Sequence, residues 1–230
     1  MSSATPRRDF LKHSAWLSLA AFGLTARAAE PAPAGKLSRL RTSLNAYSFY
    51  VELNLGLKDP TNPRAMNLSQ LLAFTAEAGF DAIDLTGYFF ASYPKAPTDA
   101  EIFAIKLEAF RLGLEISGSG VKNEATTADK ALRAEGKQRI KDWVEVCAKL
   151  GAPVLRVFAD TNISPQKWQA VSGGAPRDVV EGWIADDFRE CAEFAAARGI
   201  FIGVQNHGDF LTTGAEHVSL LKRINHPNCR

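Results

Sequence analysis

Polar side chains recur at alternate positions near the ends of several apolar segments. Asn45 and Tyr47 alternate with apolar residues in the first of these segments, and Arg156 does so in a later one. Gln205 and His207 close the last segment in the same way. Because successive side chains of a strand point to opposite faces of a sheet, each segment has one polar and one apolar face if it forms a strand. The pattern predicts a polar cavity that the ends of these strands share.

Two of these residues have alternative interpretations. An isolated charge inside a protein is costly, so Arg156 either binds an anionic or hydroxyl-rich substrate or pairs with Asp84 or Asp160. His207 either contacts a substrate or forms a hydrogen bond to a loop at the rim of the cavity. The sequence leaves both pairs of alternatives open.

The elements that must position these residues are short strands that alternate with long amphipathic helices. The helices end near Gly or Asn, which favour the left-handed conformation that closes many helices. Such alternation is typical of parallel strands joined by right-handed crossovers. We expect strands at 42–49, 82–88, 114–121, 153–160 and 200–207, and helices at 68–78, 98–113, 127–150, 178–198 and 214–224.

The polar positions distinguish a barrel from an open, doubly wound sheet. Strands covered by helices on both faces are apolar on both, whereas here one face collects polar groups toward the C-terminal ends. No G-x-G-x-x-G motif follows the first strand, and no helix begins directly after the glycine-rich segment 117–120. We therefore predict an α/β fold, a (β/α) TIM-type barrel with helices on the convex side and a cavity at the C-terminal mouth.

A complete barrel of eight such units takes ~250 residues or more. Five units already occupy nearly all of residues 41–230. We expect this region to be the N-terminal part of a longer barrel, truncated after about five of eight units, and to be incomplete and inactive by itself.

Residues 1–28 are typical of an export signal, and residues 29–40 of a linker. A charged start with Arg7 and Arg8 precedes the apolar run 15–24 and the small-residue site Ala26-Arg27-Ala28. The segment Arg-Arg-x-Phe-Leu-Lys resembles a twin-arginine signal. The apolar run is shorter than the ~20 residues of a membrane span. We expect a periplasmic or otherwise exported protein without a membrane span.

The charge distribution argues against a nucleic-acid partner. The net charge is +2, and the 27 Lys and Arg residues are mixed with 25 Asp and Glu residues throughout the chain. Nucleic-acid-binding domains usually carry a basic stripe, which this sequence lacks.

Four segments together resemble the sugar phosphate isomerase/epimerase family, within the xylose isomerase-like TIM barrel superfamily. They are Leu44-Asn45-Ala46-Tyr47-Ser48-Phe49, Gly79-Phe80-Asp81-Ala82-Ile83-Asp84-Leu85, Leu155-Arg156-Val157-Phe158 and Gln205-Asn206-His207. The resemblance covers the chain from about Thr42 to Asn228. It implies a metal-dependent isomerase or epimerase that moves a proton through an enediolate of a small sugar or sugar derivative.

The resemblance also implies roles for individual residues. A Glu that ligates a divalent ion (Mn, Mg, Co or Zn) in the family matches Gln205, which can coordinate through its amide oxygen but cannot act as a base. The catalytic residues and other ligands are expected beyond Arg230. Tyr47 and Phe49 are candidates for a surface on which the sugar stacks. The expected contacts to the carbohydrate substrate are Asn45, Tyr47, Arg156, Asn206 and His207.

Three other functions compete with this prediction. An exported lyase or hydrolase of oxidised glycosides needs similar chemistry, and the neutral Gln205 is compatible with a sugar-binding barrel that has no catalysis. An abasic-site endonuclease shares the barrel, but it uses several His ligands, and the first four predicted strands end without His.

Overall fold

The computed structural model describes residues 40–159, 167–207 and 210–230. Residues 41–230 form one compact unit. The predicted leader, nearly all of the predicted linker, and Asp160 lie outside the described residues. No helix within the described ranges combines the length and apolarity required to cross a membrane.

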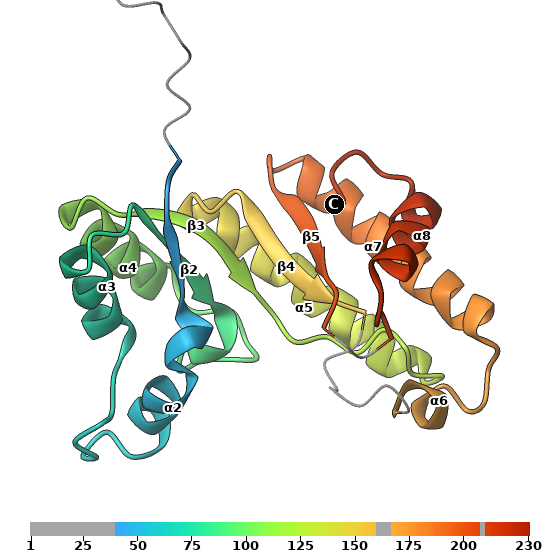
Figure 1. The fold of residues 1–230 in the computed structure, drawn as a ribbon, viewed down its shortest axis with the longest axis horizontal. Coiled ribbons are helices and arrows are strands. Elements are labelled where there is room, and N and C mark those ends of the chain that lie inside the picture. The colour runs from blue at the N-terminus through green and yellow to red at the C-terminus, as the bar shows by residue number, and fades with distance from the viewer. Residues whose placement is uncertain (1–39, 160–166, 208–209) are drawn as a thin grey trace, which may run out of the picture. The chain divides into compact units, whose positions relative to one another are not determined.

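Five strands form one parallel sheet in which their spatial order follows their order in the chain (Figure 1). A doubly wound sheet would instead place β1 between other strands. The sequential order therefore confirms the predicted α/β fold of the barrel type. The strands are β1 (Ser43–Asn45), β2 (Ala82–Thr86), β3 (Glu115–Gly120), β4 (Val154–Phe158) and β5 (Phe201–Gln205).

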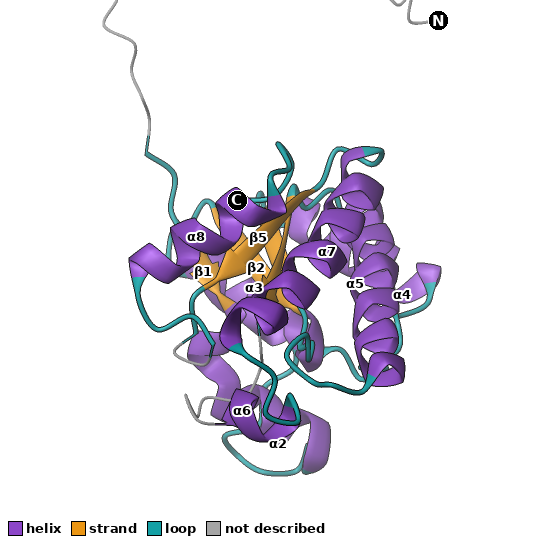
Figure 2. Ribbon diagram, turned by 90° about the vertical axis from the view of Figure 1, so that its right-hand side faces the viewer, coloured by secondary structure: helices purple, strands orange, loops and turns teal. Residues whose placement is uncertain are grey.

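The helices lie behind and beside the sheet, and α4, α5 and α7 run along one side of the strands (Figures 1 and 2). Two of them, α2 and α6, were not predicted, and both views place them near the end of the sheet where the strands terminate. The helices are α2 (Tyr50–Lys58), α3 (Leu68–Glu77), α4 (Asp99–Arg111), α5 (Lys130–Leu150), α6 (Lys167–Val171), α7 (Arg177–Ala196) and α8 (Gly214–Ile224).

Local signals define where the long helices begin and end. Thr98 and Thr213 begin α4 and α8 with capping boxes, in which each side chain accepts a backbone N–H and a Glu side chain accepts the N–H of the cap. Asp129 caps α5, and Gly151 ends it with φ +82°. These predicted boundaries differ from the observed ones by at most a few residues.

The apolar positions of the strands face the helices and form the core. These strand side chains and the helix side chains that pack against them are shielded from solvent. Burial of apolar surface is the main favourable term in folding. The fully buried strand residues include Ile83, Leu85, Leu155, Val157 and Ile202, and the helix residues include Trp143, Ile184 and Phe188.

The first two strands are shorter than the sequence suggests. β1 ends at Asn45, whose Oδ1 accepts a hydrogen bond from the backbone N–H of Tyr47 at 2.9 Å and so begins the short 3-10 helix η1 (Ala46–Phe49). A second 3-10 helix, η2 (Gly87–Phe89), follows β2 in the same way. Asn competes for backbone groups in this manner, and alternation of apolar residues does not reveal it.

A bulge changes the predicted faces of β3. Ile83 pairs with Ile116 but Asp84 pairs with Gly118, so Ser117 is an extra residue in β3. After the bulge Gly118 shares a face with Asp84, and Ser119 turns to the other face, where its hydroxyl donates to the carbonyl of Leu85. Ser119 therefore lies on the face opposite to the one that regular alternation along the strand would give it.

Residues 228–230 continue the sheet beyond β5. The N–H of Ile202 donates to the carbonyl of Asn228 at 2.9 Å, and the N–H of Arg230 donates to the carbonyl of Ile202 at 2.9 Å. Cys229 pairs with Ile202 in the parallel direction. This segment therefore lies where a sixth parallel strand of a barrel would lie.

Candidate functional site

The site is built around an ion pair between two strands. Arg156 in β4 binds Asp84 in β2 through both carboxylate oxygens, with Nε to Oδ2 at 3.0 Å and Nη2 to Oδ1 at 2.8 Å. The two side chains are 20% and 15% exposed. Asp84 is one of the two carboxylates predicted as partners of Arg156, and the other, Asp160, lies outside the described residues. The pair with Asp84 satisfies the need of a partly buried charge for a partner.

The ion pair extends into a hydrogen-bonded network across the sheet. Arg156 Nη1 donates to Gln205 Oε1 at 3.0 Å, and Nη2 lies 3.4 Å from Thr86 Oγ1. Thr86 Oγ1 in turn donates to Asn45 Oδ1 at 3.4 Å. The structure thus brings together Asn45, Arg156 and Gln205, as predicted from alternation, and joins them through Asp84 and Thr86. We call this face of the sheet the inner face.

Glycines make room for the guanidinium. A Cβ atom on Gly120 would lie 3.1 Å from Arg156 Nη2, and one on Gly118 would lie 3.0 Å from Asp84 Oδ2. Gly203, which pairs with Arg156 in the sheet, would place a Cβ 3.8 Å from Arg156 Cγ. Any larger residue at the first two positions would crowd the ion pair. This explains the glycine-rich segment of β3, for which the sequence suggested no role.

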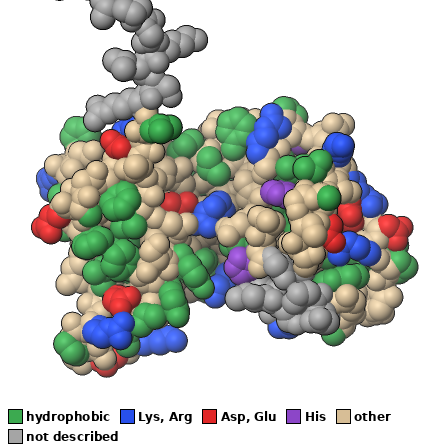
Figure 3. Space-filling view, viewed as in Figure 1, with side chains coloured by type: hydrophobic (Ala, Val, Ile, Leu, Met, Phe, Trp, Pro, Cys, Tyr) green, Lys and Arg blue, Asp and Glu red, His purple; other side chains and the backbone are tan. Residues whose placement is uncertain are grey.

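The inner face is a hollow where opposite charges meet. In the space-filling view, acidic and basic side chains lie together near the middle of the face, with histidine beside them (Figure 3). Burial lowers the pKa of Arg156, but the hydrogen bond and the negative charge of Asp84 outweigh it and raise that pKa. Arg156 therefore stays charged, and Asp84 neutralises it.

Tyrosines form one edge of the site. Tyr47 in η1 stacks on Tyr50 with ring centroids 5.3 Å apart, and it meets the edge of Tyr88 at 6.1 Å. Tyr47 and Tyr50 are 46% and 50% exposed. Burial raises the pKa of Tyr88 to about 12, so its phenol stays protonated at neutral pH. The sequence analysis did not single out either of the two partners of Tyr47: Tyr50 lies just beyond the predicted first strand, and Tyr88 is the last residue of the predicted second strand.

Phe49 does not belong to this edge. Its ring packs against Phe74 of α3 with centroids 5.0 Å apart. The prediction that Phe49 offers a stacking surface is wrong, because β1 ends at Asn45 and the turn of η1 sends Phe49 toward the helices.

Asn206 and His207 follow β5 directly but lie outside the Arg156 network. Asn206 is exposed, and the half-buried His207 packs its ring against Phe158 with centroids 4.8 Å apart. No described residue forms a hydrogen bond with His207 Nδ1, which is buried. Their predicted contacts with a substrate stay a prediction.

The residues present do not fit a metal ion at Gln205. Because a guanidinium can only donate hydrogen bonds, the Gln205 oxygen that could coordinate an ion is the atom that faces Arg156. Within the described ranges no group of three or more His, Cys, Asp or Glu residues could hold a metal ion. Coordination by Gln205 stays a prediction from the sequence that this geometry does not favour.

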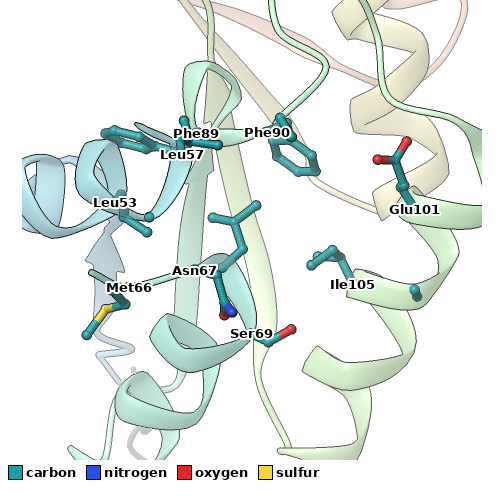
Figure 4. A pocket seen from close by; sticks show the side chains of 13 residues that line it. Leu53, Leu57, Met66, Asn67, Ser69, Phe89, Phe90, Glu101 and Ile105 are labelled. Atoms are coloured by element: carbon teal, nitrogen blue, oxygen red, sulfur yellow. The ribbon is translucent and has the colours of Figure 1, made fainter. Parts of the chain in front are cut away.

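An apolar pocket lies elsewhere. It measures about 380 Å³ and lies among α2, α3, η2 and α4. Figure 4 shows its mostly apolar lining, which includes Leu53, Met66, Phe90 and Ile105. It shares no residue with the Arg156 network, so the polar inner face is the better candidate for chemistry.

The sequence of this chain matches the family model described as xylose isomerase-like TIM barrel over residues 72–230. The chain belongs to this family. A comparison of this xylose isomerase-like barrel with curated protein sequences finds no match.

Solved structures share the fold. D-psicose 3-epimerase in the presence of D-fructose is 20% identical, with a TM-score of 0.61 over 83% of this chain and 62% of that one. The 3-keto-D-glucoside 4-epimerase of E. coli is 16% identical, with a TM-score of 0.59 over 71% and 62%. A xylose isomerase-like barrel from Mycobacterium smegmatis in complex with magnesium is 18% identical, with a TM-score of 0.55 over 70% and 54%. This barrel therefore spans less than two thirds of the length of these structures.

Proposed function

We propose that this xylose isomerase-like barrel binds a small sugar or sugar derivative on the inner face and acts on it as an isomerase or epimerase. The observation that carries the proposal is the polar network of the inner face, which reaches the C-terminal strand ends at Asn45, Thr86 and Gln205. Barrel enzymes place their active sites at these strand ends. The solved sugar epimerases with the same fold support this substrate class.

The electrostatics of the network favour a neutral, hydroxyl-rich ligand. Asp84 cancels the charge of Arg156, so the site offers a free anion little net attraction. Arg156 makes four hydrogen bonds to side chains, which leaves one of its five N–H groups for a ligand. Amides, hydroxyls and a protonated phenol supply further polar contacts, as sugar hydroxyl groups require.

The exposed tyrosines complete such a site. Sugars present apolar C–H faces as well as hydroxyl groups, and aromatic rings bury large apolar area with defined geometry. Tyr47 and Tyr50 offer a pair of nearly parallel rings at 17° beside the polar network. We assign them to packing against one face of the sugar.

The inner face is assigned to binding and orienting the substrate. Isomerisation and epimerisation both remove a proton beside a carbonyl, which needs a base. Asp84 is held by Arg156, and the amide of Gln205 cannot accept a proton, so we assign neither as the base. A divalent ion (Mn, Mg, Co or Zn) stays an expectation for the whole protein, and no step is assigned to it here.

A sugar-binding protein without catalysis is the second candidate. This candidate is favoured by the charge state of the same network. The inner face carries a neutralised ion pair and a neutral Gln205 in place of free carboxylates. The two candidates predict the same binding and differ only in proton transfer.

The first prediction tests both candidates with D-fructose in D₂O. In the whole protein, the hydrogen on one of the two carbons beside the carbonyl should exchange for deuterium, as observed by NMR, with formation of an isomer or epimer. Arg156→Lys keeps a charge beside Asp84 but loses the planar guanidinium, and it should weaken fructose binding and exchange by about tenfold. Arg64→Lys, in the exposed pair with Glu52, is the matched control and should change neither.

The outcomes separate the candidates clearly. Binding without exchange would support the non-catalytic sugar-binding protein. Absence of binding by the unchanged protein would contradict the proposal.

A further inference from the structure

We infer that Gln205 is a hydrogen-bond donor to a ligand oxygen and not a ligand of a metal ion, because Arg156 sets the orientation of its amide. The inference rests on the proposed function only for the identity of the ligand, a sugar. It assigns to Gln205 a positioning role that its place at the end of a barrel strand does not predict.

The first step concerns the two ends of the amide. Arg156 Nη1 lies 3.0 Å from Gln205 Oε1. A guanidinium carries five N–H donors and no acceptor, whereas the amide has an acceptor oxygen and a donor nitrogen. Turning the amide by 180° would bring two donors together, so Oε1 must face Arg156 and Nε2 must point away from it.

The second step is that Arg156 itself is fixed. Asp84 holds two of its nitrogens, and Nη2 also contacts Thr86. Gly118 and Gly120 lie close enough to the ion pair that any Cβ there would approach its atoms within 3.0 to 3.1 Å. A guanidinium held on so many sides cannot readily turn away to release Oε1.

The third step concerns the free end of the amide. No described residue accepts a hydrogen bond from Gln205 Nε2. This atom is also not shielded from solvent. Gln205 is half-buried and lies on the polar inner face. Its N–H groups are therefore available to a ligand that enters the hollow.

The chemistry of this end decides what it binds. A divalent ion near Nε2 would meet the positive end of the N–H dipoles as well as the nearby charge of Arg156. A carbonyl or hydroxyl oxygen instead offers lone pairs to the N–H groups. The site on β5 therefore recognises a sugar oxygen.

The experiment compares Gln205→Glu with Gln205→Leu. Glu can still accept from Arg156 but has no N–H to donate, and Leu has neither group. Both variants should bind D-fructose about tenfold more weakly than the unchanged protein, which corresponds to one lost hydrogen bond. Gln169→Glu, on the exposed face of α6, makes the same chemical change away from the site and should bind normally. Fructose binding by Gln205→Glu at or above the original affinity would overturn the inference.

A second measurement uses Mn²⁺ alone and does not depend on the sugar. Gln205→Leu should leave the Mn²⁺ affinity of the protein within about twofold, measured by calorimetry, since Oε1 is not a metal ligand. A loss of tenfold or more would overturn the inference. If the unchanged protein binds no fructose, the proposed function fails, and the Mn²⁺ comparison still decides whether Gln205 is a metal ligand. An unchanged protein without measurable Mn²⁺ affinity would likewise support the inference that it is not. Because Gln205→Glu keeps the bond to Arg156, it remains a usable variant even if Gln205→Leu folds poorly.

Discussion

At the scale of single residues, the site requires glycines, which have no side chain, as well as the polar residues of the network. Arg156 can reach Asp84, Thr86 and Gln205 at once only because β3 passes it with glycine. Four hydrogen bonds then determine the position of one guanidinium, and the guanidinium determines the orientation of one amide.

The residue-scale prediction is that Gly120→Ala disturbs this arrangement. The added Cβ would lie 3.1 Å from Arg156 Nη2 and 3.2 Å from Cζ, so the guanidinium must shift and its bonds to Thr86 and Gln205 must lengthen. We expect the free energy of unfolding to fall by about 1–3 kcal/mol, as overpacking usually costs, and fructose binding to weaken. Urea denaturation and calorimetry measure the two effects.

Gly214→Ala is the matched control for this prediction. A Cβ on Gly214, the first residue of α8, has no neighbour within 4 Å. This variant should keep its stability and its affinity. Unchanged stability and affinity of Gly120→Ala would show that Arg156 can move freely, against the interpretation of the site.

At the scale of elements, α5 and α7 are joined behind the sheet by a cluster of ion pairs. Lys137 lies 2.6 Å from Glu190 and 3.3 Å from Asp187, and Lys141 also pairs with Glu190. Arg133 lies 3.7 Å from Asp187. The cluster links the helices that cover β3, β4 and β5, and so it supports the strands that carry Arg156 and Gln205.

The element-scale prediction concerns acid. Hydrogen bonds from Lys137 and Lys141 hold the pKa of Glu190 below its usual value, so Glu190 stabilises the fold above that value, and this stability is lost as the pH falls through the folded-state pKa. Because the Glu190 side chain is 45% exposed, solvent screening limits its contribution to ~0.5 kcal/mol. Glu190→Gln should lower the free energy of unfolding by that amount at pH 7, and the difference should vanish in acid.

Urea denaturation at several pH values measures this effect, and Glu193→Gln provides the control. Glu193 is exposed on the same helix and forms no ion pair with a described residue. Burial raises the pKa of Asp187, which gives Asp187 the opposite pH dependence, so only the difference between variant and parent is informative. A difference that persists unchanged in acid would contradict the assigned role of Glu190.

At the scale of the whole molecule, residues 41–230 are a compact part of a barrel, preceded by a segment that we propose to be an export signal. Twin-arginine export carries proteins that are already folded, so a protein that uses this route folds before it crosses the membrane. The proposed signal lies outside the described residues, and its role remains a proposal.

The whole-molecule prediction is that Arg7→Lys with Arg8→Lys retains the protein in the cytoplasm. The twin-arginine route reads the arginine pair itself, so an equal positive charge should not replace it. Cell fractionation with an antibody against the protein measures the distribution, and Lys12→Arg serves as a control that keeps the pair. Undiminished export of the double variant would instead indicate the general secretion route.

The sequence by itself determined the class of fold. Apolar residues repeat with one period in strands and another in helices, because each element buries one face against the other. Capping residues such as Thr98, Asp129 and Gly151 act on neighbouring backbone groups, so the helix boundaries were also predictable. The same alternation placed Asn45, Arg156 and Gln205 on one face of the sheet.

Only the tertiary structure decided how those residues meet. The choice of Asp84 as partner of Arg156, the bulge at Ser117 and the direction of the Gln205 amide depend on the register between strands that are distant in the chain. Alternation predicts the face on which a side chain lies but not its neighbour on the next strand. The donor and acceptor ends of an amide become distinct only when a partner such as Arg156 is in place.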